Sequence, residues 1–347
     1  MDLNQITIES KATVLEALNK LNQIRKVSRL ILFVKNQKGK IIGSITDGDI
    51  RRSLSLNQDL QKSVEEVCFK GFVHHFENND FIDLSVYRAQ NIKILPVLNN
   101  NGTLSRVIDL EITQSTLPLE CMIMAGGRGK RLSPLTDTIP KPMLPLGGKP
   151  IIEHNIDRLI SYGIKKIYIS VKYLGEQIES HFGDGSSKGI SIEYIWEDEP
   201  LGTAGALRLV DKFNSDYVLL MNSDLFTNVN FEEMYLLILK EKADMVVAST
   251  EYKVDVPYAV FETKGNKVKA FKEKPSYVYQ SNAGVYMLKR SLIDQMTKNE
   301  YCDITEVMET LVQDGGKLVY DPILGFWIDI GKPTDYKQAQ EFIKHFK

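Results

Sequence analysis

A glycine-rich segment followed by two cations is the part of this sequence best equipped for chemistry. It reads Met-Ile-Met-Ala-Gly-Gly-Arg-Gly-Lys-Arg-Leu over residues 122–132, and Lys-Pro follows at 141 and 142. A continuous apolar run predicts a buried parallel strand. The glycines after it allow the backbone to approach a ligand and to direct N–H groups toward it. Arg131 and Lys141 add positive charge to the same region, so these residues predict a cradle for a polyphosphate.

Two common phosphate-binding loops do not fit this segment. A Walker A loop needs Ser or Thr after its Gly-Lys pair, but Arg131 follows Gly129 and Lys130. The dinucleotide fingerprint needs a third glycine at the position where Leu132 stands. A longer string is therefore needed to interpret the loop.

That string is G-G-x-G-x-R-L-x-P-L-T at residues 126–136, with K-P at 141 and 142. It resembles the signature of the sugar-1-phosphate nucleotidyltransferases, and the resemblance extends over roughly residues 121–340. It implies that Arg131 holds the β- and γ-phosphates of a nucleoside triphosphate and that Lys141 binds the α-phosphate or the sugar phosphate. The loop residues that it implies in nucleotide binding are Ala125, Gly126, Gly127 and Gly129.

Two carboxylates suit a divalent cation. Asp224 follows the apolar run 217–221, and Asp329 lies in Trp-Ile-Asp-Ile-Gly, a run too apolar to hold a charge without a partner. Mg²⁺ typically takes one or two carboxylates together with substrate phosphates. A lone carboxylate at Asp224 could also cap a turn. The family resemblance implies that both residues bind Mg²⁺.

The motif Leu-Gly-Thr-Ala-Gly-Ala at 201–206 opens a predicted helix with small residues. Such a start could simply pack closely against a strand. The resemblance instead implies that Gly202, Thr203 and Ala204 lie beside the nucleobase. The sequence of this motif favours GTP over dTTP, because thymidylyltransferases usually have Gln near the position of Thr203. UTP remains open.

Two further motifs follow in the order of the family. Glu-Lys-Pro at 273–275 implies that Lys274 binds the sugar phosphate and that Glu273 binds sugar hydroxyls. Asn-Ala-Gly-Val-Tyr at 282–286 implies that Asn282 faces the sugar and that Gly284 permits its close approach. Charged residues after a strand are otherwise usually just solvated.

A mechanism follows from this set of residues. The second phosphate pKa is about 6, so a sugar 1-phosphate is already ionised near neutral pH and needs no general base. It needs alignment with the α-phosphorus and relief from like-charge repulsion. Positioning and electrostatic stabilisation supply most of the catalysis in phosphoryl transfer.

Residues 1–115 contain two related units, at about 1–60 and 61–115. Each has a helix followed by strand–turn–strand, and the pair resembles a CBS-domain pair. The ribose-contacting pattern G-x-x-T-x-x-D is present at 43–49, which implies that Thr46 and Asp49 bind an adenine or guanine nucleotide. The second unit has Asp109 and Ile112 instead, so at most one nucleoside site is complete. The alternative is a pair used only for packing or dimerisation, and a homo-oligomer is expected.

The fold expected is α/β: a doubly wound, mixed-sheet, Rossmann-like nucleotidyltransferase domain at 121–347, preceded by the α+β CBS pair and a linker at 116–120. Strands and helices alternate in this domain as such a fold requires. Ligands bind beyond the carboxyl ends of the strands in open α/β sheets. The predicted helices are 151–162, 175–182, 204–213 and 231–242, and the predicted strands are 167–171, 190–195, 217–221 and 245–249.

Composition narrows the class of protein. The 347 residues carry a net charge of −2, which argues against a nucleic-acid binder held by bulk charge. There is no apolar run of about 18 residues and no basic, apolar N-terminal segment, so neither a membrane span nor a signal peptide is predicted. Three scattered cysteines predict no disulfide framework or zinc site. A cytoplasmic protein is expected.

The whole chain, a CBS pair fused to a nucleotidyltransferase, resembles a bacterial group of glucosamine-1-phosphate guanylyltransferases in legionaminic (nonulosonic) acid biosynthesis. The resemblance implies Mg²⁺-dependent attack of a hexose 1-phosphate on the α-phosphate of GTP, giving a GDP-sugar and pyrophosphate for surface glycans. Mannose or heptose 1-phosphate, or UTP or dTTP, remain alternatives. An inactive nucleotide-sensing protein is another. It should have lost a phosphate cation or metal carboxylate, and all five are present: Arg131, Lys141, Asp224, Lys274 and Asp329.

Overall fold

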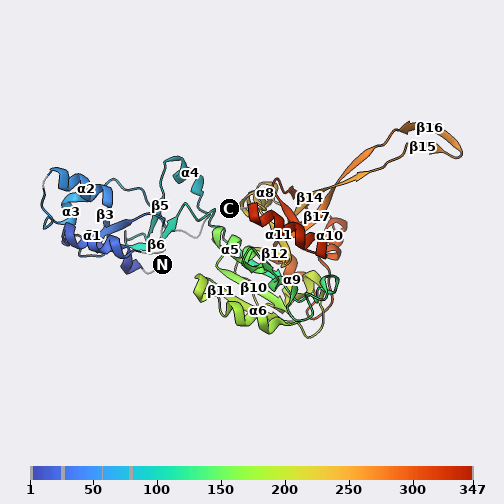
Figure 1. The fold of residues 1–347 in the computed structure, drawn as a ribbon, viewed down its shortest axis with the longest axis horizontal. Helices are drawn as coiled ribbons and strands as arrows, with labels where there is room; N and C mark the ends of the chain where they lie inside the picture. Colours follow the sequence, from blue (N-terminus) through green and yellow to red (C-terminus); the bar gives the residue numbers. More distant parts are fainter. Residues whose placement is uncertain (1–2, 25–27, 57, 78–80, 346–347) are drawn as a thin grey trace. The chain divides into compact units, whose positions relative to one another are not determined.

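The computed structural model describes residues 3–24, 28–56, 58–77 and 81–345, and the chain divides into two compact units (Figure 1). The first unit is Met1–Pro118 and the second is Leu119–Lys347. Each unit has its own hydrophobic cores.

The first unit contains the same arrangement twice. In each copy a short outer strand runs parallel to a central strand, which pairs antiparallel with the third. The first copy comprises a 3₁₀ turn at Leu3–Gln5, β1 Thr7–Glu9, α1 Val14–Gln23, β2 Ile31–Lys35, β3 Ile41–Thr46 and α2 Asp47–Leu56. The second comprises α3 Val64–Val67, β4 His75–Phe76, α4 Leu84–Ala89, β5 Ile94–Leu98 and β6 Leu104–Asp109. The repeat inferred from the sequence is therefore present in the backbone.

The two copies differ after their third strand. In the first, α2 follows β3 at once, whereas residues 110–119, all described, form no helix after β6. Asp109, at the end of β6, accepts hydrogen bonds from the backbone N–H and the hydroxyl of Ser28 at 2.7 and 2.8 Å. The residue that replaces threonine in the second copy thus ties its sheet to the first copy.

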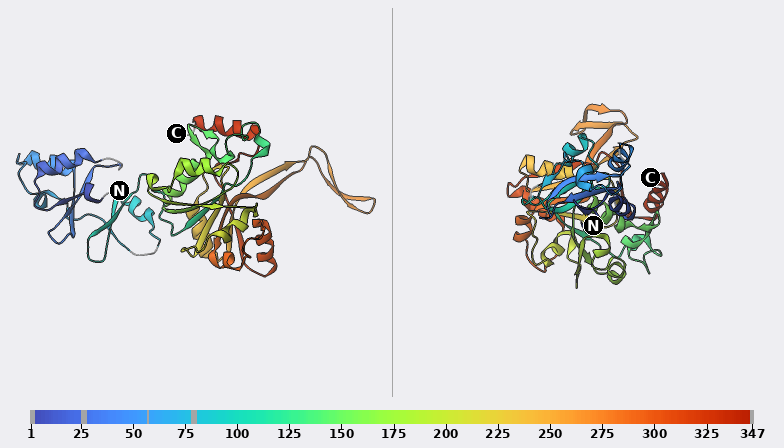
Figure 2. Two further views of the ribbon diagram at one scale, coloured as in Figure 1. Left: turned by 90° about the horizontal axis from the view of Figure 1, so that it is seen from below. Right: turned by 90° about the vertical axis from the view of Figure 1, so that its left-hand side faces the viewer.

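A seven-stranded mixed sheet forms the centre of the second unit. Its strands in spatial order are β11 Ser191–Trp196, β10 Lys166–Val171, β7 Glu120–Met124, β12 Tyr217–Asn222, β17 Ser276–Lys289, β14 Met245–Asp255 and β18 Leu318–Pro322. Only β17 is antiparallel to its neighbours. Helices lie on both faces of the sheet (Figure 2), which is why β7 is buried on both sides and reads as an unbroken apolar run. The doubly wound mixed fold is confirmed.

The helices of this unit follow the predicted positions closely, with one exception. They are α5 Ile151–Ser161, α6 Gly175–Phe182, α7 Gly202–Gly205, α8 Phe231–Glu241, α9 Arg290–Gln295, α10 Ile304–Gln313 and α11 Pro333–His345. The helix predicted over 204–213 is wrong: α7 is one turn long and continues as a 3₁₀ turn, Ala206–Leu209. Gly202 and Gly205 press against the backbone of Cys302 and Glu300, so tertiary packing ends the helix early.

Short elements outside the central sheet complete the unit. They are the hairpin β8 Pro145–Leu146 and β9 Lys149–Pro150, the pair β13 Leu225–Thr227 and β19 Trp327–Asp329, the hairpin β15 Val260–Lys264 and β16 Lys267–Lys272, and 3₁₀ turns at Lys130–Leu132, Lys141–Met143 and Ser186–Lys188.

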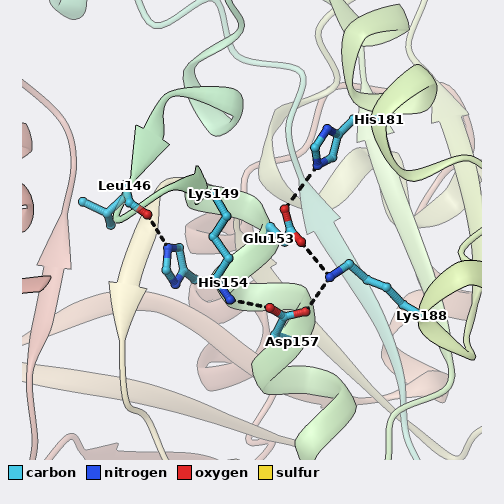
Figure 3. A network of polar contacts seen from close by, with 7 residues as sticks. All are labelled: Leu146, Lys149, Glu153, His154, Asp157, His181 and Lys188. Carbon is cyan, nitrogen blue, oxygen red and sulfur yellow. Dashed lines mark hydrogen bonds and ion pairs between the residues drawn. The ribbon is translucent and has the colours of Figure 1, made fainter. Parts of the chain in front are cut away.

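The solvent-facing side of α5 carries a network of charges (Figure 3). Glu153 accepts hydrogen bonds from Lys188 at 2.7 Å and from His181 at 3.2 Å, and Asp157 pairs with Lys188 and Lys149. Burial alone would raise the pKa of both carboxyls, but these hydrogen bonds outweigh it, and both pKa values are lowered. The network fixes α5 against the β8–β9 hairpin, which follows the turn that carries Lys141.

Within the described residues, no helix is both long and apolar enough to span a bilayer.

Asp321 on the edge strand β18 gives a test of the fold by pH. Burial and the nearby Glu233 raise the pKa of Asp321 to about 6. The folded state therefore disfavours its ionisation, and this destabilisation appears as the pH rises from about 4 through 6. Asp321→Asn is expected to raise the melting temperature of the second unit by roughly 2–4 °C at a pH of about 7.5. The gain should vanish toward a pH of about 4.5.

The control is Asp211→Asn, which changes an exposed carboxylate of the same unit. An equal gain for Asp321→Asn at both pH values in scanning calorimetry would contradict the assignment.

Candidate active site

The glycine-rich loop leaves the carboxyl end of β7 between β10 and β12. Ala125 still belongs to the sheet, because its N–H donates to the Ser170 carbonyl at 2.8 Å. Gly129 has a φ of +65°, and a Cβ there would lie 3.0 Å from the Cβ of Lys141. Thr136 fixes this turn by donating to the Gly129 carbonyl at 2.9 Å. Glycine at 129 thus brings Lys141 against the loop.

Lys141 and Asp224 form an ion pair beneath the loop. The ammonium of Lys141 contacts Oδ2 of Asp224, which lies between β12 and β13. Lys141 is buried. Oδ1 of Asp224 is buried and has no hydrogen-bond partner among the described residues. A buried carboxylate oxygen of this kind is costly unless a donor or cation meets it.

Asp329 lies beside Asp224 although the two are far apart in the chain. The register of β13 and β19 sets Asp329 opposite Leu225, and the N–H of Ile330 donates to the Asp224 carbonyl at 3.1 Å. Ile328 and Ile330 are buried, whereas Asp329 between them is exposed. The sequence predicted that apolar neighbours would enclose the Asp329 carboxylate, and this prediction is wrong for its side chain. Partial burial against the surrounding protein and the negative charge of Asp224 nevertheless raise the pKa of Asp329. The positive charges of Lys141 and Arg131 act in the opposite direction and lower it.

Arg131 completes this group of charges. A Cβ at Gly331 would lie 3.4 Å from its Nη2 atom, so the glycine after β19 leaves room for the guanidinium. Arg131, Lys141, Asp224 and Asp329 therefore converge at the carboxyl edge of the sheet. They come from four segments between residues 131 and 329.

The donor set fits a hard divalent cation that shares its coordination with a substrate. Asp224 offers a buried oxygen without a partner, and Asp329 faces solvent beside it. The described part of the chain holds no cluster of three or more His, Cys, Asp or Glu that could enclose an ion. Mg²⁺ is usually held by one or two carboxylates and completes its shell with phosphates and water. Asp224 and Asp329 are the residues that would hold it.

The residues expected beside the nucleobase are held by the start of α10. The N–H and hydroxyl of Thr203 donate to Asp303 at 3.2 and 3.1 Å, and the N–H of Ala204 donates to the Cys302 carbonyl at 2.9 Å. Gly202 has a φ of +75°, and a Cβ would lie 2.6 Å from the Cys302 carbonyl oxygen. Packing thus accounts for these small residues without a ligand.

Glu197 is a residue of this region that the sequence reasoning missed. It is buried and accepts hydrogen bonds from the Ser170 hydroxyl and from the N–H of Leu201, the latter at 2.9 Å. A Cβ at Gly126 would lie 3.2 Å from its Oε1 atom. Glu197 thus links the phosphate loop to the 201–206 segment. Its position directly after the 191–196 strand was the available signal, because carboxylates at strand ends in this fold line the ligand crevice.

Asn282 and Gly284 lie next to the end of β12. Oδ1 of Asn282 accepts from the Gly284 N–H at 2.9 Å, and Gly284 has a φ of +74°. A Cβ at Gly284 would lie 2.7 Å from Nδ2 of Asn222, two residues before Asp224. The structure therefore brings Asn282 and Gly284 close to the carboxylate site.

Glu273 and Lys274 do not join this group. They precede β17, which runs in extended pairing with β14 from Asn282 outward to Ser276. Eight residues of extended chain separate Lys274 from Asn282, a span of about 25 Å. Both residues are exposed in the described structure.

Thr46 and Asp49 of the first unit form the start of α2. The N–H and hydroxyl of Thr46 donate to Asp49 at 2.8 and 2.6 Å, and the Asp49 N–H donates to the Thr46 hydroxyl at 3.3 Å. Arg52 also pairs with Asp49 at 2.5 Å. This is the reciprocal pattern of a helix capping box. Nucleotide binding by Thr46 and Asp49 remains a prediction.

Comparison with known proteins agrees with the fold and the motifs. Residues 120–345 match the nucleotidyl transferase family, and residues 1–56 match the CBS domain. The chain belongs to the nucleotidyl transferase family and carries a CBS domain at its N-terminus.

Three relatives illustrate the range of this similarity. The chain is 30% identical over 228 residues to a mannose-1-phosphate guanylyltransferase of Mycobacterium tuberculosis, covering 64% of each protein. It is 32% identical over 233 residues to a D-glycero-alpha-D-manno-heptose 1-phosphate guanylyltransferase of Aneurinibacillus thermoaerophilus, covering 66% of this chain and all of the relative. The crystal structure of HddC from Yersinia pseudotuberculosis, complexed with GMP-PN, superposes with a TM-score of 0.51 at 24% identity, over 65% of this chain and 99% of that one. The chain thus spans less than two thirds of the mycobacterial relative's length.

The ion pair between Lys141 and Asp224 can be tested by a double-mutant cycle. Lys141→Met and Asp224→Asn each leave one charge without its partner in a partly buried place, so each should lower the free energy of unfolding by about 2 kcal/mol. The double variant should cost less than the sum, because neither charge remains. Urea unfolding at neutral pH measures all four proteins.

The matched control is the more exposed pair Lys149 and Asp157. Its coupling energy should be below about 1 kcal/mol. Strict additivity at Lys141 and Asp224 would show that the two side chains do not act as a pair.

Proposed function

We propose that this chain is a sugar-1-phosphate guanylyltransferase that joins glucosamine 1-phosphate to the α-phosphate of GTP, with Mg²⁺, and releases pyrophosphate. The observation that carries the proposal is the convergence of Arg131, Lys141, Asp224 and Asp329 beyond the carboxyl ends of the sheet strands. Two cations and two carboxylates at one sheet edge suit a polyphosphate and a cation that shares it.

The chain's own residues would act by positioning. The amides of the loop from Gly126 to Gly129 and the Arg131 guanidinium hold the departing pyrophosphate. Lys141 exchanges part of its contact with Asp224 for the α-phosphate and offsets the repulsion between the two phosphates. Mg²⁺, when bound at Asp224 and Asp329, supplies neutralising charge at the phosphate oxygens. The sugar-phosphate oxygen then forms its bond to the α-phosphorus as the bond to pyrophosphate breaks.

Glu197 supports guanine as the base. The N1–H and the exocyclic amino group of guanine form a row of donors, and a carboxylate is an acceptor for such a row. Each carboxylate oxygen has a second lone pair beyond its contact with Ser170 or Leu201. Uracil and thymine offer one N–H between two carbonyl oxygens, and a carboxylate repels these oxygens. The guanylyltransferase names of two relatives point the same way.

The sugar and the role of the first unit are proposed from the architecture of the whole chain and from its relatives. Glucosamine 1-phosphate is proposed because the whole chain, CBS units fused to this type of domain, resembles the glucosamine-1-phosphate guanylyltransferase group. Mannose or heptose 1-phosphate is the second candidate, because relatives carry those names. An adenine or guanine nucleotide at Thr46 and Asp49 would make the first unit a regulatory one.

Pyrophosphate release tests the proposal directly. The intact chain with Mg²⁺ would be assayed with GTP, UTP, dTTP, CTP and ATP, each against glucosamine, mannose, glucose and heptose 1-phosphates. Turnover is expected with GTP and highest with glucosamine 1-phosphate. Asp224→Asn and Asp329→Asn should each lower kcat by about 100-fold or more, the size of effect seen when transition-state charge loses its stabilisation. Turnover confined to UTP or dTTP would overturn the base assignment.

Glu197→Gln tests base selection separately. The amide replaces one acceptor by a donor, so the ratio of kcat/KM for GTP to that for UTP should fall by about tenfold or more. Glu193→Gln, on the strand that Glu197 follows but paired with Lys166 at the surface, is the matched control. An unchanged ratio in Glu197→Gln, with an unaltered melting temperature, would remove Glu197 from base recognition.

A further inference from the structure

A long two-stranded arm, residues 251–280, extends from the central sheet (Figures 1 and 2). It consists of the outer halves of β14 and β17 and the hairpin β15–β16. The inner halves of β14 and β17 are buried, but exposure begins abruptly at Thr250 on one strand and Asn282 on the other. An isolated two-stranded hairpin is at best marginally stable in water.

The arm has one apolar face. The pairing of β14 with β17 sets Tyr252 opposite Tyr279 and Val254 opposite Tyr277. The other face is mostly polar, with one apolar residue: it carries Glu251, Lys253, Asp255, Ser276, Val278 and Gln280. In the distal hairpin, Phe261 is opposite Phe271. Seven of the apolar side chains of the arm are between 54% and 75% exposed: Tyr252, Tyr258, Phe261, Val268, Phe271, Val278 and Tyr279. A sheet with one apolar and one polar face ordinarily has its apolar face covered.

The arm also carries the Glu-Lys-Pro motif at its midpoint. Lys274 has a φ of +46°, a left-handed conformation that is strained for a residue with a side chain. Such strain concentrates at functional positions. The same strand pairing that gives the arm its length keeps Glu273 and Lys274 about 25 Å from Asn282 of their own chain.

We propose that the arm packs on a second copy of this chain and carries Glu273 and Lys274 into the active site of that copy. The proposal rests on the sugar-phosphate role proposed for this site. In a symmetric pair each chain gives an arm and receives one, so both sites are completed at once. Each site would then consist of Arg131, Lys141, Asp224 and Asp329 from one chain and Glu273 and Lys274 from the other.

Charge and area favour a second copy as the occupant. The arm has six lysines and four carboxylates, a net charge of +2 within a chain of net charge −2, so the remainder of the chain is acidic and attracts it. An aromatic side chain offers about 150–250 Å². The exposed aromatic residues of the arm could therefore bury on the order of 600 Å², close to the roughly 800 Å² per partner of a stable interface.

Complementation between two defective chains tests the exchange. Lys274→Ala and Asp224→Asn would be co-expressed with different affinity tags, and the mixed dimer would be isolated through both tags. The homodimer of each variant should lose at least about tenfold in activity, since each lacks a charge at the phosphates. The mixed dimer contains one intact site and should recover about half of the wild-type activity. A mixed dimer as inactive as its parents would overturn the proposal.

Lys269→Ala is the matched control for this experiment, because Lys269 lies on the same arm outside the Glu-Lys-Pro motif. Its homodimer should keep wild-type activity. Loss of activity equal to that of Lys274→Ala would contradict a specific delivery of Lys274.

A second readout does not depend on turnover. Light and isotopically heavy full-length chains would be mixed, crosslinked through lysines and analysed by mass spectrometry. Crosslinks from Lys264, Lys267 and Lys272 to the body of residues 119–249 should join a light chain to a heavy one. Phe261→Ser with Phe271→Ser should abolish them without lowering the melting temperature, because both side chains are exposed.

These results separate the two proposals. Arm crosslinks confined to single chains, or a monomer at tens of micromolar, would overturn the arm exchange whatever the substrate. Heavy–light crosslinks without turnover on any substrate pair would support the exchange and count against the proposed function.

Discussion

The candidate active site depends on two like-charged carboxylates that the fold holds close together. Asp224 and Asp329 are neighbours across β13 and β19, and the repulsion between them helps to raise the pKa of Asp329. Lys141 and Arg131 offset this repulsion from the side of the loop. Because a buried carboxylate oxygen remains without a partner at Asp224, the group is electrostatically incomplete in the protein alone. A cation and a polyphosphate are the groups that we propose to complete it.

Several glycines serve this one arrangement. Gly129 admits Lys141, Gly331 leaves room for Arg131, and Gly284 admits Asn222. In each case a Cβ would come within 3.4 Å of the side chain that must enter. These three glycines are therefore explained by protein packing as much as by approach of a ligand, and the same holds for Gly202 against Cys302, whereas a Cβ at Gly127 would meet nothing within 4 Å.

Glu197 and the arm show two ways in which function can lie outside the recognisable motifs. Glu197 connects the phosphate loop with the segment expected to hold the base, and it does so through hydrogen bonds to Ser170 and Leu201. The arm holds the Glu-Lys-Pro motif, which the family resemblance assigns to the site, away from the site of its own chain. The positions of Glu197 and of the Glu-Lys-Pro motif both depend on where the strands end. β11 ends at the ligand crevice, whereas β14 and β17 continue far beyond it.

The sequence by itself determined the class of fold, the repeat in the first unit and the residues that could meet a polyphosphate. Strand and helix periodicity and the glycine-rich string are local, so they can be read from residues 122–141 or 175–182 alone. Local patterns failed at 204–213, where contacts with residues 300–302 replace most of the predicted helix.

Only the tertiary structure decided which candidates meet. Asp224 and Asp329 share a site because β13 pairs with β19, and pairing across a hundred residues leaves no trace in a local pattern. Strand pairing also separates Glu273 and Lys274 from Asn282, although they are close in sequence, since an extended chain spans about 3.3 Å per residue. Proximity in space is set by register and by where strands end, and both are properties of the packed chain.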